Sequence, residues 1–220
     1  MNRFTRKLLG TILGVAIVLA VRYGGDLIAE ATMGPKIEEL SGVWHCMEDN
    51  SYDAQDLLEI ADFYEEELAV IGENPLNLVK LVEFRQDRTY RFSYDVDASK
   101  EQVRQFYAAA LDDLYENRAD LAEVYGDEVV VLTRDEFMQT YAEFYGMANY
   151  DALLDAFTDN AYRYDRLGED TETGTYTIKG SDIMCTITGQ DRAESLGYTL
   201  EGDNLSLIYS NDTEYYTRAN

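Results

Sequence analysis

The sequence predicts an α+β protein with eight antiparallel strands, arranged as a closed barrel or as a strongly bent sheet. Three observations support this prediction. A C-terminal run of alternating strands is separated by turn residues, one strand and a hairpin come earlier, and helical patterns lie between the two groups. The chain has 220 residues, 46% of them hydrophobic, which is enough for one sizeable core.

The first three strands come from two regions of the N-terminal half. Gly42-Val43-Trp44-His45-Cys46 alternates in polarity, as a half-buried strand does. Lys80–Arg85 and Thr89–Tyr94 flank Gln86-Asp87-Arg88, a turn-forming stretch, and therefore predict a hairpin. Alternating apolar and polar residues in both arms indicate that one face of this hairpin contacts water.

Helical patterns fill the gaps between these strands. The apolar spacing over Asp53–Ile71 predicts one helix, which Gly72 ends. A longer helical insertion is expected at about residues 97–165, between the third and fourth strands. The expected N-caps in this insertion are Ser99 with Gln102, Thr133 with Glu136, and Asn149.

The C-terminal part reads as a series of hairpins. The connecting turns contain Gly, Asn, Asp and Ser, which tolerate turn geometry. The expected strands are Thr175–Lys179, Asp182–Thr188, Ser195–Glu201, Asn204–Tyr209 and Thr213–Arg218. Together with the earlier three they make eight, and an eight-stranded barrel holds either packed side chains or one small ligand.

The strand sequences resemble a known family pattern. Gly42-Val43-Trp44 on a first strand, with hairpinned strands at 174–180 and 198–205, resembles the lipocalin or calycin pattern. The similarity covers residues 41–92 and 174–220 and is typical of lipocalin-like domains of uncharacterised secreted or membrane-anchored bacterial proteins. It implies a lipocalin-like domain over residues 41–220, and the helical insertion departs from plain lipocalins. The candidate ligand-binding residues are Trp44, Tyr90, Phe92, Tyr176 and Tyr198.

The N-terminus predicts export. Arg3, Arg6 and Lys7 precede the apolar run Leu8–Val21, the layout of a secretory signal. As a helix this run reaches roughly 21 Å, short of a hydrocarbon core of roughly 30 Å. Residues 1–31 are therefore expected to be a signal peptide, cleaved near Ala29-Glu30-Ala31, or a membrane anchor. Either outcome places the remaining domain outside the cytoplasmic membrane, secreted or anchored.

The negative net charge of the sequence restricts the classes of partner that the protein can bind. Asp and Glu outnumber Lys and Arg by 43 to 18, giving a formal net charge of -25. Such a surface repels nucleic-acid phosphates and anionic headgroups. We therefore expect no nucleic-acid partner, and membrane contact only through residues 1–28.

The two cysteines are expected on the same strand faces as their core-facing neighbours. Cys46 follows Trp44 by two residues, and Cys185 lies between Ile183 and Ile187. In an oxidising compartment they are candidates for a disulfide that joins the first strand to the C-terminal sheet. Two separate buried thiols are the alternative interpretation.

The sequence contains few residues or motifs that are typical of a catalytic site. His45 is the only histidine. One His and two Cys are fewer Cys and His ligands than the four of a typical structural zinc site. No Gly-rich phosphate loop and no G-x-S-x-G motif occur. We therefore expect no catalytic residues, no metal site and no cofactor. One aromatic set in the helical region is a candidate groove for an apolar ligand, or simply core: Tyr141, Phe144, Tyr145, Tyr162 and Tyr164.

These observations favour a noncatalytic, extracytoplasmic binding or interaction module. Its expected partner is a small apolar ligand, a glycan or a protein. Two alternatives stay open: a secreted hydrolase that uses carboxylates, and a structural envelope-associated protein without a small ligand.

Overall fold

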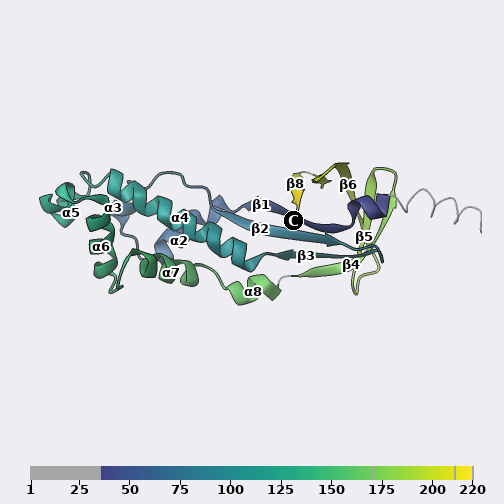
Figure 1. Cartoon of the computed structure of the whole chain (residues 1–220), viewed down its shortest axis with the longest axis horizontal. Helices are drawn as coiled ribbons and strands as arrows, with labels where there is room; N and C mark the ends of the chain where they lie inside the picture. The colour runs from purple at the N-terminus through teal and green to yellow at the C-terminus, as the bar shows by residue number, and fades with distance from the viewer. Residues whose placement is uncertain (1–35, 170, 211, 220) are drawn as a thin grey trace, which may run out of the picture.

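The computed structural model describes residues 36–169, 171–210 and 212–219. The predicted signal or anchor, residues 1–31, lies outside this part of the chain. The described molecule is elongated, with a β-barrel toward one end and a group of helices at the other (Figure 1). None of the helices in the described ranges has the length and apolar character needed to span a membrane.

Eight strands form a closed antiparallel barrel. In chain order they are β1 (Gly42–Asp49), β2 (Asn77–Phe84), β3 (Thr89–Tyr94), β4 (Glu172–Lys179), β5 (Asp182–Ile187), β6 (Ala193–Glu201), β7 (Asn204–Ile208) and β8 (Thr213–Arg218). Each strand pairs with the next, and β8 pairs back onto β1 through Trp44 opposite Arg218 and His45 opposite Thr217. The predicted α+β class and eight-stranded barrel are confirmed.

Two insertions supply the helices. Between β1 and β2 lie η1 (Ser51–Asp53), α2 (Ala54–Ile60) and α3 (Glu65–Leu68). Between β3 and β4 lie α4 (Val96–Glu116), α5 (Ala122–Tyr125), η2 (Asp127–Val131), α6 (Arg134–Phe144), α7 (Tyr150–Ala161) and α8 (Tyr164–Glu169). We call α2 to α7 with their connections the helical lobe.

The single helix predicted over Asp53–Ile71 is wrong, because the chain breaks between α2 and α3. Asp62 adopts a positive φ of 59°, and Tyr64 is extended. The break turns Phe63 into the lobe core, where its ring lies 5.5 Å from that of Phe157. The helix restarts because the Glu67 carboxylate accepts the Tyr64 backbone N–H at 2.7 Å. Tertiary packing therefore overrides a continuous helical pattern.

The cap predicted at Ser99 is also wrong, whereas those at Thr133 and Asn149 are confirmed. Helix α4 begins one turn earlier, where Asp95 accepts the Ala98 N–H at 3.0 Å. Ser99 is buried inside the helix, and its hydroxyl accepts the backbone N–H of Val79 on β2 at 2.9 Å. This contact joins the helical lobe to the barrel.

The molecule has two hydrophobic cores. The lobe core surrounds α4, whose buried face presents Val103, Phe106, Tyr107, Ala110, Leu111 and Leu114. The barrel core contains inward-facing side chains from the strands, together with Ile37 and Leu40 from the helical residues 36–40. Both clusters are made of residues at the periods expected for helices and strands.

One end of the barrel is closed around Trp44. Its indole Nε1 donates to the Leu40 carbonyl at 2.9 Å, and the Arg218 guanidinium lies 4.1 Å from the ring centroid. Arg218 also donates to the carbonyls of Ser41 and Glu39. The last strand is thereby tied to the segment before the first, which fixes barrel closure at this end.

Candidate functional site

The predicted ligand-binding residues come together in the barrel, where they are part of its packed core. Trp44, Tyr90 and Tyr176 are buried, and Phe92 and Tyr198 pack against the same cluster. The Tyr90 hydroxyl donates to Glu172 and the Tyr176 hydroxyl donates to the Arg85 carbonyl, both at 2.9 Å. Both hydroxyl groups therefore have hydrogen-bond partners within the chain, and both rings belong to the buried cluster of the barrel.

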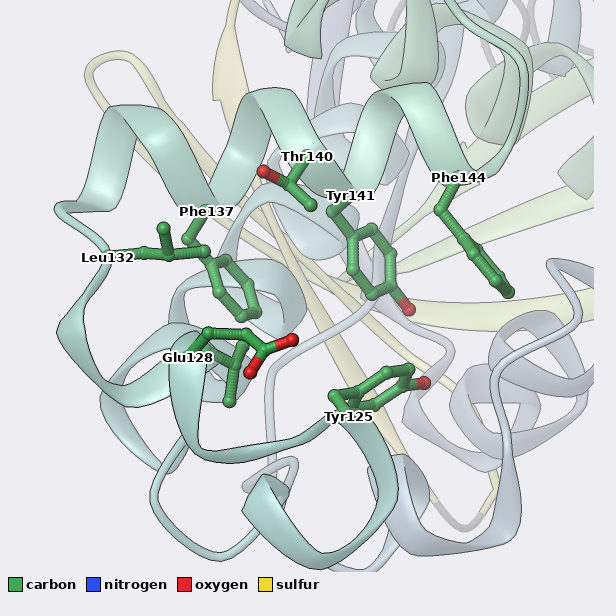
Figure 2. A pocket seen from close by; sticks show the side chains of 8 residues that line it. Tyr125, Glu128, Leu132, Phe137, Thr140, Tyr141 and Phe144 are labelled. Carbon is green, nitrogen blue, oxygen red and sulfur yellow. The ribbon is translucent and has the colours of Figure 1, made fainter.

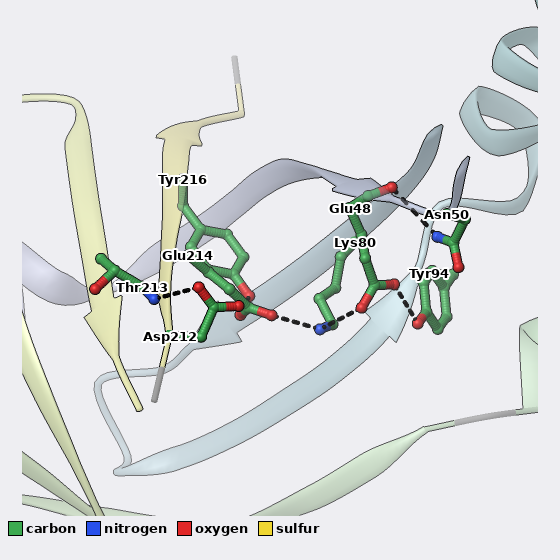
Figure 3. A network of polar contacts seen from close by, with 8 residues as sticks. All are labelled: Glu48, Asn50, Lys80, Tyr94, Asp212, Thr213, Glu214 and Tyr216. Carbon is green, nitrogen blue, oxygen red and sulfur yellow. Dashed lines mark hydrogen bonds and ion pairs between the residues drawn. The ribbon is translucent and has the colours of Figure 1, made fainter. Parts of the chain in front are cut away.

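A network of charges lines the barrel end that faces the helical lobe (Figure 3). The Lys80 ammonium lies 2.7 Å from Glu214 and 3.0 Å from Glu48. Tyr94 donates to Glu48 and Tyr216 donates to Glu214, each at 2.6 Å. The network therefore joins β1, β2, β3 and β8.

Within this network, the positive charge of Lys80 is compensated by the carboxylates of Glu48 and Glu214. Burial alone would lower the pKa of Lys80, but hydrogen bonds to Glu214 and Glu48 outweigh it and raise that pKa. Burial likewise opposes ionisation of Glu214, whose pKa is nevertheless lowered by the hydrogen bonds from Lys80 and Tyr216. Lys80 is thus held protonated, which suits an ion pair and not a nucleophile.

Cys46 and Cys185 are buried free thiols in the structure. They lie on β1 and β5, which are not neighbours in the barrel. Burial raises the pKa of Cys46 to about 11 and that of Cys185 to about 12. Both thiols are therefore protonated and poorly reactive at neutral pH.

His45 lies on the outer side of the barrel. Its Nε2 is 3.1 Å from the Thr217 hydroxyl of the paired strand β8. Across residues 36–169, 171–210 and 212–219, no group of three or more His, Cys, Asp or Glu is arranged to hold a metal ion.

An apolar cavity lies in the helical lobe beside α5 and α6, which are at the end remote from the barrel (Figure 1), and Figure 2 shows its lining side chains. Its volume is about 320 Å³, at the small end of the range for ligand pockets. Aromatic and aliphatic side chains form most of its wall: Tyr125, Val129, Leu132, Phe137, Tyr141 and Phe144. Glu128 and Thr140 add the polar groups. We call this cavity the lobe pocket.

Local structure explains how one wall of the lobe pocket is built. Phe137, Tyr141 and Phe144 are spaced four and three residues apart on α6, which puts them on one helix face. Thr133 fixes the start of that helix through a reciprocal cap with Glu136. The opposite wall comes from α5 and η2, which are joined by Gly126.

A buried carboxylate anchors two pocket tyrosines. Glu67 is 1% exposed, and its Oε1 accepts the hydroxyls of Tyr125 at 2.5 Å and Tyr141 at 2.8 Å. Burial and the adjacent carboxylate raise the pKa of both tyrosines. The two rings are therefore held as neutral hydrogen-bond donors, and α3, α5 and α6 are tied together at this point.

The elements that form the lobe pocket also carry exposed apolar side chains. Phe144 is 58% exposed although it lines the cavity, and Val131, beside the lining residue Leu132, is 80% exposed. Val124 and Val130 are exposed in the neighbouring α5 and η2. Exposed apolar side chains that gather in one region are typical of binding surfaces.

A second hollow of about 710 Å³ lies between α2 and the segment 71–75. Its wall mixes Leu58, Leu68 and Phe106 with polar residues such as Gln55 and Asn74. Asp113 accepts hydrogen bonds from Gly72 N–H and the Asn74 amide, which fixes this loop. The lobe pocket is the more apolar of the two cavities, and it is the better candidate for an apolar ligand.

The sequence anticipated part of the lobe pocket. Of the predicted aromatic groove, Tyr141 and Phe144 line the cavity and Tyr145 packs against both rings. Tyr162 and Tyr164 lie elsewhere, against each other and, for Tyr164, beneath Lys100. Tyr125 and Glu128 were missed because α5 and η2 are too short to show a periodic pattern.

Comparisons with known proteins returned no match, whether to family models, to curated proteins or to solved structures.

Proposed function

We propose that the chain is a noncatalytic extracytoplasmic binding module in which a lipocalin-like barrel is the scaffold and the lobe pocket holds the ligand. The observation that carries the proposal is the apolar cavity of about 320 Å³ between α5, η2 and α6. Its lining favours a ligand with an apolar body.

The packed barrel supports the scaffold role. Trp44, Phe84, Tyr176 and Tyr216 are all fully buried between the strands. The Gly42-x-Trp44 pattern on β1 and the closed eight-stranded barrel support the lipocalin-like assignment. In this proposal the barrel residues stabilise the fold, and the ligand contacts lie in the insertion.

The carboxylate arrangement favours binding over hydrolysis. A carboxylate hydrolase needs two acids in a cleft that are free to act on a substrate. Glu48 and Glu214 share the ammonium of Lys80, and both Glu67 oxygens accept hydrogen bonds. We therefore assign these acids structural roles.

A second candidate function is docking of a protein partner at the same end of the lobe. The specific observation is that Val124 of α5 and Val130 and Val131 of η2 are exposed. Such a partner would cover the lobe pocket. A variant that fills the pocket is therefore expected to affect protein docking as well as ligand binding.

Ligand binding is tested with the neutral fluorescent probe N-phenyl-1-naphthylamine. We expect saturable fluorescence enhancement that Thr140→Trp removes, since Thr140 lines the lobe pocket. The matched control is Thr177→Trp, at an exposed position on the outer face of β4. Enhancement that survives Thr140→Trp, or none in the unaltered protein, contradicts the proposed ligand site.

Location is tested separately, with a reporter enzyme fused after Asn220. We expect a reporter that folds only outside the cytoplasmic membrane to be active when residues 1–31 are present and inactive when they are deleted. A fusion active only in the cytoplasm would overturn the proposed export.

A further inference from the structure

We infer that the ligand of the lobe pocket is a small amphipathic cation, an apolar chain or ring that carries an ammonium group. This inference rests on the proposed binding function and adds the charge of the ligand. It is carried by three features: a carboxylate at the pocket wall with no ion-pair partner among the described residues, aromatic rings in the same wall, and lobe arginines that already have partners within the chain.

The first feature is Glu128, the charged residue of the pocket wall. Figure 2 shows its side chain turned toward the rings of Phe137 and Tyr125. None of the described Lys or Arg side chains forms an ion pair with it. A carboxylate beside an apolar wall gains most from a cation that brings its own apolar surface.

Backbone geometry positions this carboxylate. Gly126 has φ of 88° and ψ of 158°, a conformation that favours glycine. A Cβ atom there would lie 3.3 Å from the Glu128 carboxyl carbon, so glycine also leaves room for the carboxylate. The turn between α5 and η2 therefore supports the placement of Glu128 at the pocket.

The second feature is the aromatic content of the wall. Phe137 and Tyr141 stack with ring centroids 6.0 Å apart, and Phe144 remains half exposed at the surface. Aromatic faces attract ammonium groups, and the attraction increases when the group is partly desolvated. The rings thus favour the same head group as Glu128, while Val129 and Leu132 suit the apolar body.

The third feature is that three arginines of the helical lobe already have partners within the chain. Arg134 pairs with Asp112, and Arg104 pairs with Asp151 and Asp155. Arg118 donates to the carbonyls of Tyr115 and Val130. The charges of Arg134 and Arg104 are thus compensated by carboxylates of the chain, and the net charge of the whole sequence is -25.

Three soluble probes with the same six-carbon chain test the inference: hexylammonium, 1-hexanol and hexanoate. Their dissociation constants are measured at pH 7 by NMR, from shifts of the aromatic signals of Phe144 and Tyr125. We expect hexylammonium to bind severalfold more tightly than hexanol, and hexanoate to bind most weakly. Added salt should narrow this difference.

Charge variants locate the effect. Glu128→Gln should weaken hexylammonium binding by about two- to fivefold and leave hexanol unchanged, because one partly exposed ion pair is lost. The matched control Asp127→Asn removes the neighbouring exposed charge, which does not line the lobe pocket, and should change binding less.

The outcomes separate the two proposals. If hexanol and hexylammonium bind equally, or if Asp127→Asn has the same effect as Glu128→Gln, the cation inference fails and the binding site stands. If none of the three probes shifts the Phe144 and Tyr125 signals, the proposed function itself fails.

Discussion

At the scale of single residues, Glu67 shows how a polar group can determine an apolar site. Its carboxylate is buried at 1% exposure and accepts two tyrosine hydroxyls and one backbone N–H. A buried carboxylate without such partners would be strongly unfavourable. The three hydrogen bonds therefore allow Glu67 to hold Tyr125 and Tyr141 in the wall of the lobe pocket.

We expect Glu67→Ala to lower the free energy of unfolding by about 3 kcal/mol, because the buried hydroxyl of Tyr141 and the half-buried hydroxyl of Tyr125 lose a charged acceptor. Urea unfolding monitored by circular dichroism measures the change. Glu66→Ala, at the exposed neighbouring position, is the control and should stay within about 0.5 kcal/mol of the unaltered protein. Equal losses in the two variants would contradict the anchoring role of Glu67.

The two cysteines allow a second prediction at this scale. Because burial raises the pKa of Cys46 to about 11 and of Cys185 to about 12, native protein should react slowly with iodoacetamide at pH 8. Denatured, unreduced protein should gain two alkyl groups by mass spectrometry, in agreement with the free thiols of the structure. No mass gain before reduction would instead indicate the disulfide that the sequence allows.

At the scale of secondary-structure elements, capping decides where the longest helix begins. Asp95 caps α4, and the helix then packs through the whole length of its buried face. The sequence pattern pointed to Ser99 because Gln102 follows it at capping-box spacing. Asp95 is equally suited to capping, and only the contact of Ser99 with Val79 shows which residue serves which role.

We expect Asp95→Ala to lower the free energy of unfolding by about 1 kcal/mol, since one helical N–H loses its acceptor. Asp97→Ala is the matched control, because Asp97 is exposed in the first turn and does not cap the helix. It should have a smaller effect, limited to the helix dipole. Thermal unfolding of the unaltered protein and the two variants, under the same conditions, measures the differences in stability. A larger loss of stability in Asp97→Ala than in Asp95→Ala would contradict the capping role of Asp95.

At the scale of the whole molecule, polar contacts close the barrel at both ends. Arg218 ties β8 to the segment before β1. At the other end, Lys80 links Glu48 of β1 to Glu214 of β8 (Figure 3). These contacts supplement the backbone register between β1 and β8, which extends over only two residue pairs.

The barrel network predicts a pH dependence. Because the folded pKa of Glu214 is lowered, its contribution to stability is present above the unfolded pKa, about 4.3, and is lost as the pH falls through the folded value. We expect the stability difference between the unaltered protein and Glu214→Gln to be largest near pH 7 and to shrink below about pH 4. Urea unfolding across this range measures it.

Glu201→Gln, at an exposed position on β6, serves as the control. Its stability relative to the unaltered protein should change little with pH, since Glu201 forms none of the described ion pairs. A difference for Glu214→Gln that is constant from pH 7 to pH 3 would show that the Lys80 pair does not contribute through ionisation.

The sequence by itself determined the strands, their inward parity and the position of the helical insertions. Trp44, Cys46 and Tyr176 face the barrel core as their alternation predicted, because side chains on a strand alternate between two faces. The face of α6 that carries Phe137, Tyr141 and Phe144 was likewise visible in the helical spacing.

Only the tertiary structure decided whether the barrel was closed or open and where the cavity lay. The pairing of β1 with β8 closes the barrel and is supported by Arg218 reaching Ser41 and Glu39, and Glu67 supports the lobe pocket by reaching Tyr125 and Tyr141. These contacts join residues far apart in the chain, and no local pattern specifies them. Periodicity records which face of an element is apolar, whereas the free energy of burial and ion pairing decides which faces meet.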